Sequence, residues 1–422
     1  MAQVSIAQET VVPAPANHGI TFIKNANIHT GTGKVITNGV IKINNGKIEA
    51  VGTASEVAIP ADASVTDAKG KEVYPGLILP NTNLGLIEIN AVRASNDVNE
   101  LGELNPNVRS IVAYNTDSKI INVLRSNGIL MANIVPEGSL LAGSSSVVQL
   151  DAWTWDDAVY KTDEGMHLYL PSLLPARRRP GAAAPERDAV KEGLEKIEAI
   201  KNFFRQAKAY TNNPSKEQTN IKFESVKGLF DKSQKLYLHA NTVKQILAGL
   251  DFAKEFGFDI VLVGGSDSWQ VADLLKQYNV SVILQQAHSL PTLDDDDIDQ
   301  PYKTAALLQK AGVLFSMSDW DENTKGRNLA FNAGTAVAFG LSKEEALQAI
   351  TLNAAKILGV SDKAGSIEVG KDANIIISEG DILDMRTSKV TDAFIQGRKI
   401  DLTDKQKLLN ERYEEKYKLK AF

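Results

Sequence analysis

The sequence predicts an α/β fold in which a (β/α)8 barrel carries a small composite β-sandwich domain built from both termini. Eight strand-like apolar runs alternate with helical segments between residues 73 and 362, a pattern typical of a parallel sheet with crossover helices. Short alternating strands fill residues 19–72 and return in residues 363–401, so the two ends are expected to share one sheet domain. The length of 422 residues suits a barrel plus a smaller domain.

The flanking β module is predicted from alternation and turn chemistry. ITFIKNANIHT and GVIKINNGKIEAVG alternate apolar and polar residues, and Asn45-Gly46 supplies a tight hairpin turn. GSIEVGKDANIIISEGD and VTDAFIQGRKI have the same texture near the other end. Residues 1–18 are predicted to be a flexible polar leader, and residues 402–422 a C-terminal helix of mixed charge.

The barrel strands are predicted from short apolar runs, and the helices from apolar residues at helical spacing. SKEEALQAITLNAAKILG begins with a capping box, in which Glu345 follows Ser342 by three residues. The fourth connection is long and charged, which predicts a helical insertion at about residues 187–230. The Gly/Ser-rich segment 135–146 is typical of a flexible loop rim. The eight runs are EVYPGLILP, GILMANIVP, SSVVQLDAW, MHLYLPSLL, KLYLHAN, DIVLVGG, VSVILQQA and GVLFSMSD.

Composition excludes several classes of function. The formal net charge of -6 argues against a nucleic-acid partner, and the absence of cysteine excludes disulfides and thiolate metal sites. The longest apolar runs are strand-sized, well short of the roughly 20 residues that cross a bilayer. The leader lacks the basic and apolar parts of a signal peptide. It leaves two locations open: a cytoplasmic protein, or an exported, periplasmic one whose signal has been removed.

Polar residues stand where the predicted strands end, which is where barrel enzymes place their chemistry. The first strand ends at Asn81 and Asn83, the fifth at His239 and the eighth at Asp319. The seventh ends near His288, whereas the sixth ends at a Gly-Gly pair, residues 264 and 265. These side chains are therefore the first candidates for a site at the barrel mouth.

The chain resembles the amidohydrolase superfamily, in particular its imidazolonepropionase-like and cyclic-dipeptidase-like branches. The resemblance rests on PGLI, YLHANT, SMSDW, GLSKEEALQAITLNAAKILGV and GSIEVGKDANIIISEGD, and it covers nearly the whole chain. It implies a TIM barrel with a composite β-sandwich, and hydrolysis of C–N bonds in a small amide or dipeptide-like molecule. The same fold was inferred above from the residues.

The resemblance also implies a metal centre, most of whose ligands are replaced in this sequence. The family uses H-x-H on the first strand, often a carboxylated Lys on the fourth, one His each on the fifth and sixth, and an Asp on the eighth. Only His239 and Asp319 match, and they are the catalytic candidates. Asn81 and Asn83 replace the H-x-H pair, and Gly264 or Gly265 stands where a His is expected.

Two readings of the site stay open. In the first, His288 joins His239 and Asp319 to hold one divalent transition metal, with zinc the preferred ion. In the second, the site holds no metal and consists of polar residues that are hydrogen-bonded to one another. Asn81, Asn83 and His288 are then substrate-binding candidates. The loop after the first strand adds three more, Glu88, Arg93 and Arg109, although charged residues in such loops commonly form surface ion pairs.

Two hypotheses of function follow. The first is a hydrolase of C–N bonds with a degenerate metal centre, acting on a small amide or peptide-like ligand. The second is a non-catalytic pseudoenzyme, either a ligand-binding protein or the structural partner of a metal-bearing paralogue. A homo-oligomer and a pairing with a paralogous subunit are both compatible with the sequence.

Overall fold

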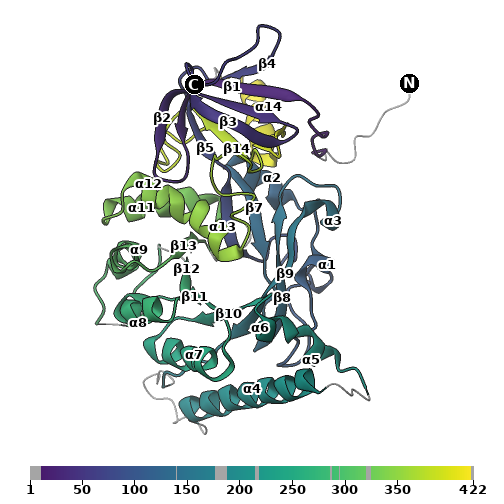
Figure 1. Ribbon diagram of the computed structural model, residues 1–422, viewed down its shortest axis with the longest axis vertical. Helices are drawn as coiled ribbons and strands as arrows, with labels where there is room; N and C mark the ends of the chain where they lie inside the picture. Colours follow the sequence, from purple (N-terminus) through teal and green to yellow (C-terminus); the bar gives the residue numbers. More distant parts are fainter. Residues whose placement is uncertain are drawn as a thin grey trace.

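The computed structural model describes residues 11–138, 140–175, 188–213, 218–285, 288–293, 295–319 and 325–419. It contains two eight-stranded sheets (Figure 1), so both parts of the predicted fold class are confirmed. The first ten residues of the predicted leader, the start of the predicted insertion and the last three residues of the C-terminal helix lie outside the described residues. No helix in the described part combines the length and apolar composition that a bilayer crossing needs.

The first sheet is built from the two ends of the chain (Figure 1), in the order β16-β15-β14-β5-β1-β2-β3, with β4 paired to β1. Isoleucines from both ends of the sequence fill its core, including Ile28, Ile41 and Ile375. The strands are β1 (Ile20–His29), β2 (Val35–Asn44), β3 (Lys47–Thr53), β4 (Ser64–Asp67), β5 (Glu72–Pro75), β14 (Ile375–Ser378), β15 (Val390–Ile395) and β16 (Arg398–Lys399).

The second sheet runs in the order β13-β12-β11-β10-β9-β8-β7-β6 and curls into a nearly closed barrel. Its two edge strands approach each other where the hydroxyl of Ser318 donates to the carbonyl of Asn81 over 3.1 Å. The strands are β6 (Leu77–Thr82), β7 (Ile129–Ile134), β8 (Leu141–Gln149), β9 (Val159–Tyr169), β10 (Lys235–Ala240), β11 (Ile260–Gly264), β12 (Ser281–Gln285) and β13 (Phe315–Ser318).

One strand departs from the predicted parallel sheet. β8 pairs antiparallel with both β7 and β9. Residues 135–140 are too few for the crossover that a parallel neighbour requires, so the chain reverses and returns beside β7. The prediction of a flexible rim over residues 135–146 is therefore wrong for its second half. Residues 141–146 form the buried start of β8, and their small side chains lie within the sheet.

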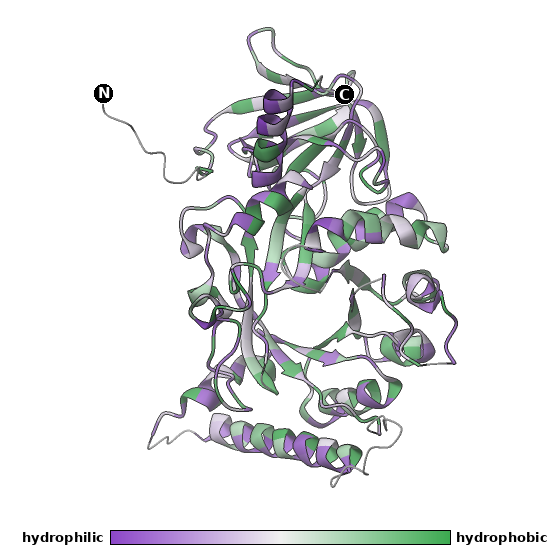
Figure 2. Cartoon of the chain, turned by 180° about the vertical axis from the view of Figure 1, so that it is seen from behind, coloured by the Kyte–Doolittle hydropathy of each residue, from purple (hydrophilic) through white to green (hydrophobic). Residues whose placement is uncertain are grey.

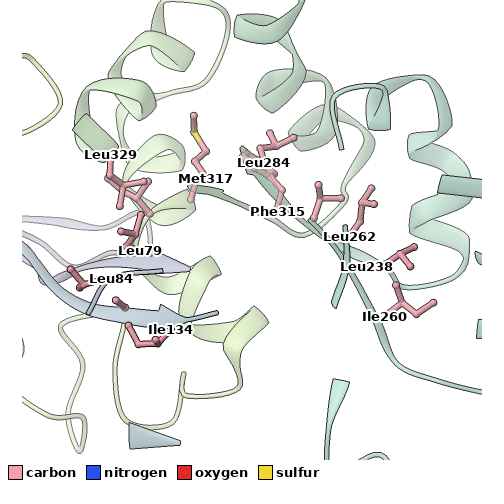
Figure 3. Packing of buried hydrophobic residues seen from close by; sticks show 14 of the residues in the cluster. Leu79, Leu84, Ile134, Leu238, Ile260, Leu262, Leu284, Phe315, Met317 and Leu329 are labelled. Carbon is pink, nitrogen blue, oxygen red and sulfur yellow. The ribbon is translucent and has the colours of Figure 1, made fainter. Parts of the chain in front are cut away.

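Helices cover the outside of the barrel sheet. Leu238, Leu262 and Phe315 point outward from the strands and pack against this layer (Figure 3). The long helix α4 (Ala189–Asn212) buries one face and exposes the other, and hydrophilic and hydrophobic residues alternate along it in Figure 2. The capping box predicted at Ser342 is confirmed, because its hydroxyl accepts from the amide of Glu345.

The remaining helical elements are short or lie at connections. They are η1 (Arg93–Ser95), α1 (Ser110–Ala113), α2 (Lys119–Ser126), α3 (Trp155–Ala158), α5 (Ile221–Ser225), α6 (Lys227–Asp231), α7 (Val243–Phe256), η2 (Ser268–Val271), α8 (Ala272–Gln277), α9 (Gln300–Ala311), η3 (Gly326–Asn328), α11 (Leu329–Ala338), α12 (Lys343–Ala349), α13 (Leu352–Leu358) and α14 (Lys405–Tyr417).

Two charged clusters join the sheet domain to the barrel. Asp151, which follows β8, is buried between the guanidinium groups of Arg125 and Arg398, and its Oδ2 lies 3.0 Å from Arg398 Nη1. In β1, His29 Nδ1 lies 2.6 Å from Glu344 of α12, and its Nε2 lies 2.9 Å from Glu72 of β5. Each cluster therefore joins side chains that are far apart in sequence.

Candidate active site at the barrel mouth

The barrel lumen has an apolar floor. Residues that point inward from the strands, including Ile78, Met131 and Val263, pack against Ala354 and Ile357 of α13. Because side chains alternate along a strand, residues two positions further toward the C-terminal end of a strand face the same lumen one layer higher. In this upper layer the inward residues are mostly polar, so the chemistry of the barrel lies between the floor and the mouth.

A β-bulge turns both strand-one asparagines toward the lumen. The pairing of β6 with β7 shifts between Leu79 and Thr82, and Thr82 then pairs with Ile134, which belongs to the outer core. Asn81 and Asn83 flank Thr82 and consequently face the opposite side, as predicted from their spacing. Asn83 Nδ2 donates to Glu137 Oε1 over 3.1 Å.

A pair of buried histidines occupies the upper layer. His167 Nδ1 lies 2.9 Å from His239 Nε2, and Tyr169 stacks on His239 at 3.7 Å between ring centroids. Burial lowers the pKa of His167 to about 3, and burial together with the neighbouring His167 lowers the pKa of His239 well below its ordinary value. Two neutral imidazoles therefore share one hydrogen bond. Sequence reasoning identified His239 but missed His167.

A buried carboxylate lies beside this pair. Glu164 accepts hydrogen bonds from Tyr237 over 2.8 Å, Ser145 over 3.1 Å and Asn133 over 3.2 Å. Burial raises the pKa of Glu164 to about 7, against the lowering effect of the hydrogen bond from Tyr237. Because all three partners act as donors, the network stabilises the ionised carboxylate within the barrel wall.

Glu137 is a second acidic group at the mouth, and sequence reasoning missed it. It follows the C-terminal end of β7, is half-buried, and bonds to Asn83. Burial raises the pKa of Glu137 to about 7, and the hydrogen bond from Asn83 opposes this shift. The hydroxyl of Tyr169 donates to the neighbouring carbonyl of Pro136 over 3.0 Å, which ties this loop to the histidine pair. One feature of the sequence could have identified Glu137: it stands directly after the second predicted strand, where barrel enzymes place their chemistry.

The structure does not bring the predicted metal ligands together. His288 is exposed, its Nε2 bonds to Thr335 Oγ1 over 2.7 Å, and its ring meets Tyr302 edge-on. Asp319 is buried directly after β13. Across the described ranges, no three His, Asp or Glu side chains form a group that could hold a metal ion. In the described ranges, His288 contacts Thr335 and Tyr302 and is not grouped with His239 and Asp319, so a metal role for this trio stays a prediction.

The backbone of the sixth strand disfavours the side chain expected there. Gly264 has φ +96°, and a Cβ at this position would lie 2.4 Å from Asn241 Oδ1 and 3.2 Å from the carbonyl of Ala240. The resemblance implies a set of metal ligands rich in imidazole groups. At the corresponding positions this site has two carboxamides, a glycine and a pair of histidines that share a hydrogen bond. This donor set, as far as the structure describes it, does not fit a transition metal bound in that manner.

The three loop candidates are exposed and contact neighbouring loops and strands. Arg109 Nη2 lies 2.7 Å from Asp163, and Glu88 accepts from Asn115 over 3.1 Å. Arg93 donates to the carbonyl of Asn96. These contacts brace the rim of the barrel, and the substrate-binding role of Glu88, Arg93 and Arg109 stays a prediction.

Comparison with known proteins places these features in a family. Residues 302–400 match the model of the amidohydrolase family. An imidazolonepropionase of Geobacillus sp. is 24% identical over 377 residues, which cover 81% of this chain and 84% of that protein. The imidazolonepropionase of Thermoplasma volcanium is 40% identical over 86 residues, so the match spans only 20% of this chain and 21% of that relative.

Solved structures agree over a longer stretch. An amidohydrolase from Thermotoga maritima superposes with a TM-score of 0.77 at 25% identity, and the match covers 90% of this chain and 99% of that one. An adenosine deaminase from Xanthomonas campestris shares the fold, with a TM-score of 0.53 at 16% identity over 96% of this chain and 99% of that one. The sequence motifs, the barrel with its companion sheet and these matches lead to one assignment: the chain belongs to the amidohydrolase superfamily.

Proposed function

We propose that this protein hydrolyses a C–N bond of a small amide at the barrel mouth, in a reaction of the imidazolonepropionase type, with its own acid and base groups in place of a full metal set. The observation that carries this proposal is the half-buried carboxyl group of Glu137, held by Asn83 where the strands end. Family membership supports the reaction class, and the polar upper layer supports the location.

Glu137 has the properties of a general acid and base. C–N hydrolysis requires a base that takes a proton from water while the oxygen adds to the carbonyl carbon, and an acid that returns a proton to the leaving nitrogen. A carboxyl group with a pKa of about 7 exists in both forms at neutral pH, so one residue can perform both transfers. Carboxamide N–H groups of Asn81 and Asn83 can stabilise the oxyanion that develops between these steps.

The experiment is turnover of imidazolonepropionate and of a panel of cyclic amides by protein purified without added metal. Glu137→Gln keeps the shape and removes the proton transfer, so kcat is expected to fall about 10²- to 10⁴-fold. Glu415→Gln, on the exposed face of α14, is the matched control and is expected to leave turnover unchanged. Unchanged turnover in Glu137→Gln would contradict the assigned role.

Metal content tests the other half of the proposal. The protein is expected to retain its activity after dialysis against a strong chelator, because the described donor set does not fit the family's metal. If near-stoichiometric zinc or iron accompanies the purified protein and its removal abolishes turnover, the metal-independent reaction is wrong.

A second candidate, a non-catalytic ligand-binding protein or partner of a metal-bearing paralogue, is favoured by one observation. The family's ligands are replaced on two strands, and Gly264 has φ +96°, a backbone conformation that disfavours an L-side chain. This candidate predicts ligand binding without turnover, and stable association with a related chain that retains its histidines. Co-expression with such a paralogue, followed by size-exclusion chromatography, separates it from the hydrolase.

A further inference from the structure

Four polar atoms on inward-facing, nine-tenths-buried side chains of the described barrel strands lack a hydrogen-bond partner. They are Asn81 Oδ1, Asn133 Oδ1, His167 Nε2 and Ser316 Oγ. Each side chain is at least nine-tenths buried, with an exposed fraction of 3% for Asn81 and 0% for the other three. Buried polar groups are normally paired, and leaving one unpaired costs its full desolvation penalty. Four such atoms around one lumen therefore leave hydrogen-bonding capacity that water or a polar guest can satisfy.

Register places these atoms around the same lumen. Asn133 lies two positions above the inward Met131 on β7, and His167 pairs with the inward Tyr237. Ser316 pairs with Ile283, another residue of the apolar floor, so it also points inward. Asn81 lies in the bulge of β6, beside β7 and opposite Asn133. The two asparagines therefore meet at one level on neighbouring strands.

The orientation of Asn133 makes its oxygen the free atom. Its Nδ2 donates to Glu164 Oε1 over 3.2 Å and lies 3.4 Å from the carbonyl of Pro80. A flipped amide would bring its oxygen against a carboxylate and a carbonyl, both of which only accept hydrogen bonds. In the present amide orientations, the free atoms of Asn81 and Asn133 are two acceptors on neighbouring strands.

The charges around the lumen favour donors over acceptors in the guest. Glu137 and Asp319 supply carboxyl groups to this end of the barrel, and the two histidines are neutral. Among cations of the described residues near these strands, Arg109 is paired with Asp163, whereas Lys235 and Lys161 lie near Glu164 and lower its pKa; Lys235 also donates to a carbonyl of α13. A carboxylate placed against the asparagine oxygens would meet acceptors and like charge.

We propose that the lumen recognises a ligand through a flat N–H donor head of the amidine or guanidine class, which donates to Asn81 Oδ1 and Asn133 Oδ1. The inference rests on the proposed function, because it names the ligand class of the same mouth. A planar head with two NH2 groups matches two neighbouring acceptors, and its positive charge suits the carboxyl groups around it. Ser316 and His167 can act as donor or acceptor and adapt to the rest of the guest.

Three isosteric probes test the proposal by ligand-observed NMR on the full chain. Acetamidine, acetamide and acetate have the same heavy-atom skeleton and differ in the number of N–H donors. We expect affinity to fall in that order, with Kd at least tenfold lower for acetamidine than for acetate. Equal or tighter binding of acetate would overturn the proposal. Binding of none of the three would also overturn it, and would mean that only water fills the lumen.

Variants locate the binding. Asn81→Leu removes one free acceptor and is expected to weaken acetamidine binding at least tenfold without loss of folded protein. Asn133→Ala removes the second free acceptor and is expected to weaken acetamidine binding as well. Asn410→Leu, on the exposed α14, is the matched control and should change neither. Unchanged acetamidine binding in folded Asn81→Leu protein would contradict the assignment.

The outcome is separable from that of the proposed function, because binding is measured without turnover. If the probes bind in the expected order but the protein hydrolyses nothing, the hydrolase proposal fails and the ligand class stands. If Glu137→Gln abolishes turnover while the order of the probes is reversed, the hydrolase stands and the amidine-type ligand is wrong.

Discussion

A side chain at position 264 is predicted to be costly for two separable reasons. Gly264 has φ +96°, a region in which an L-residue loses about 1–2 kcal/mol. A Cβ there would also meet Asn241 Oδ1 at 2.4 Å and the carbonyl of Ala240 at 3.2 Å. The amide of Asn241 can rotate away, but the carbonyl is fixed in β10, so we add about 1 kcal/mol for this contact. Gly264→Ala should lower the free energy of unfolding by about 2–3 kcal/mol.

Gly257 provides the matched control. It ends α7 with φ +77°, and a Cβ there would have no atom within 4 Å. Gly257→Ala should therefore show only the backbone term, about 1–2 kcal/mol. Urea denaturation of both variants measures the difference. Equal losses would refute the steric argument, and so would a Gly264→His protein that keeps its stability and binds zinc near stoichiometry.

Two further changes test the contacts between the domains. Asp151→Asn removes the carboxylate that lies between the buried Arg125 and Arg398. The free energy of unfolding, measured by urea denaturation, should fall by about 3–5 kcal/mol. A loss below about 1 kcal/mol, which is typical of exposed ion pairs, would contradict this prediction. Burial lowers the pKa of His29, but its hydrogen bonds to Glu344 and Glu72 outweigh this effect and raise the pKa above the ordinary value of about 6.5. The resulting stability is full below about pH 6.5 and is lost as pH rises through the raised pKa, so His29→Gln should destabilise more at pH 6 than at pH 9; a loss independent of pH would contradict this linkage.

The barrel and its companion sheet were predictable because their signals are local. Each of the eight strands is an apolar run with its own boundaries, and strand ends direct attention to Asn81, Asn83, His239 and Asp319 without any knowledge of contacts. The direction of β8 was not predictable in the same way. It depends on the length of residues 135–140, and the Gly/Ser-rich start of the strand resembles a loop because its small side chains pack inside the sheet.

The part of the site that sequence reasoning missed depends on side chains that meet from different strands. His167 was hidden in MHLYLPSLL, a run otherwise typical of a core strand, and only its 2.9 Å contact with His239 gives it a role. Glu137 was hidden at the end of a presumed loop rim, where its burial and its bond to Asn83 could not be inferred. Local spacing identified His288, but the fold turns that residue toward Thr335.

The positions where the resemblance leads one to expect metal ligands differ in how readily they would accept a histidine. Asn81 and Asn83 flank Thr82 in the bulge of β6 and face the lumen. At the end of the sixth strand, Gly264 adopts a backbone conformation that disfavours any side chain. Histidines at positions 81 and 83 would therefore add ligands from β6 alone, while position 264 would still disfavour a third side chain.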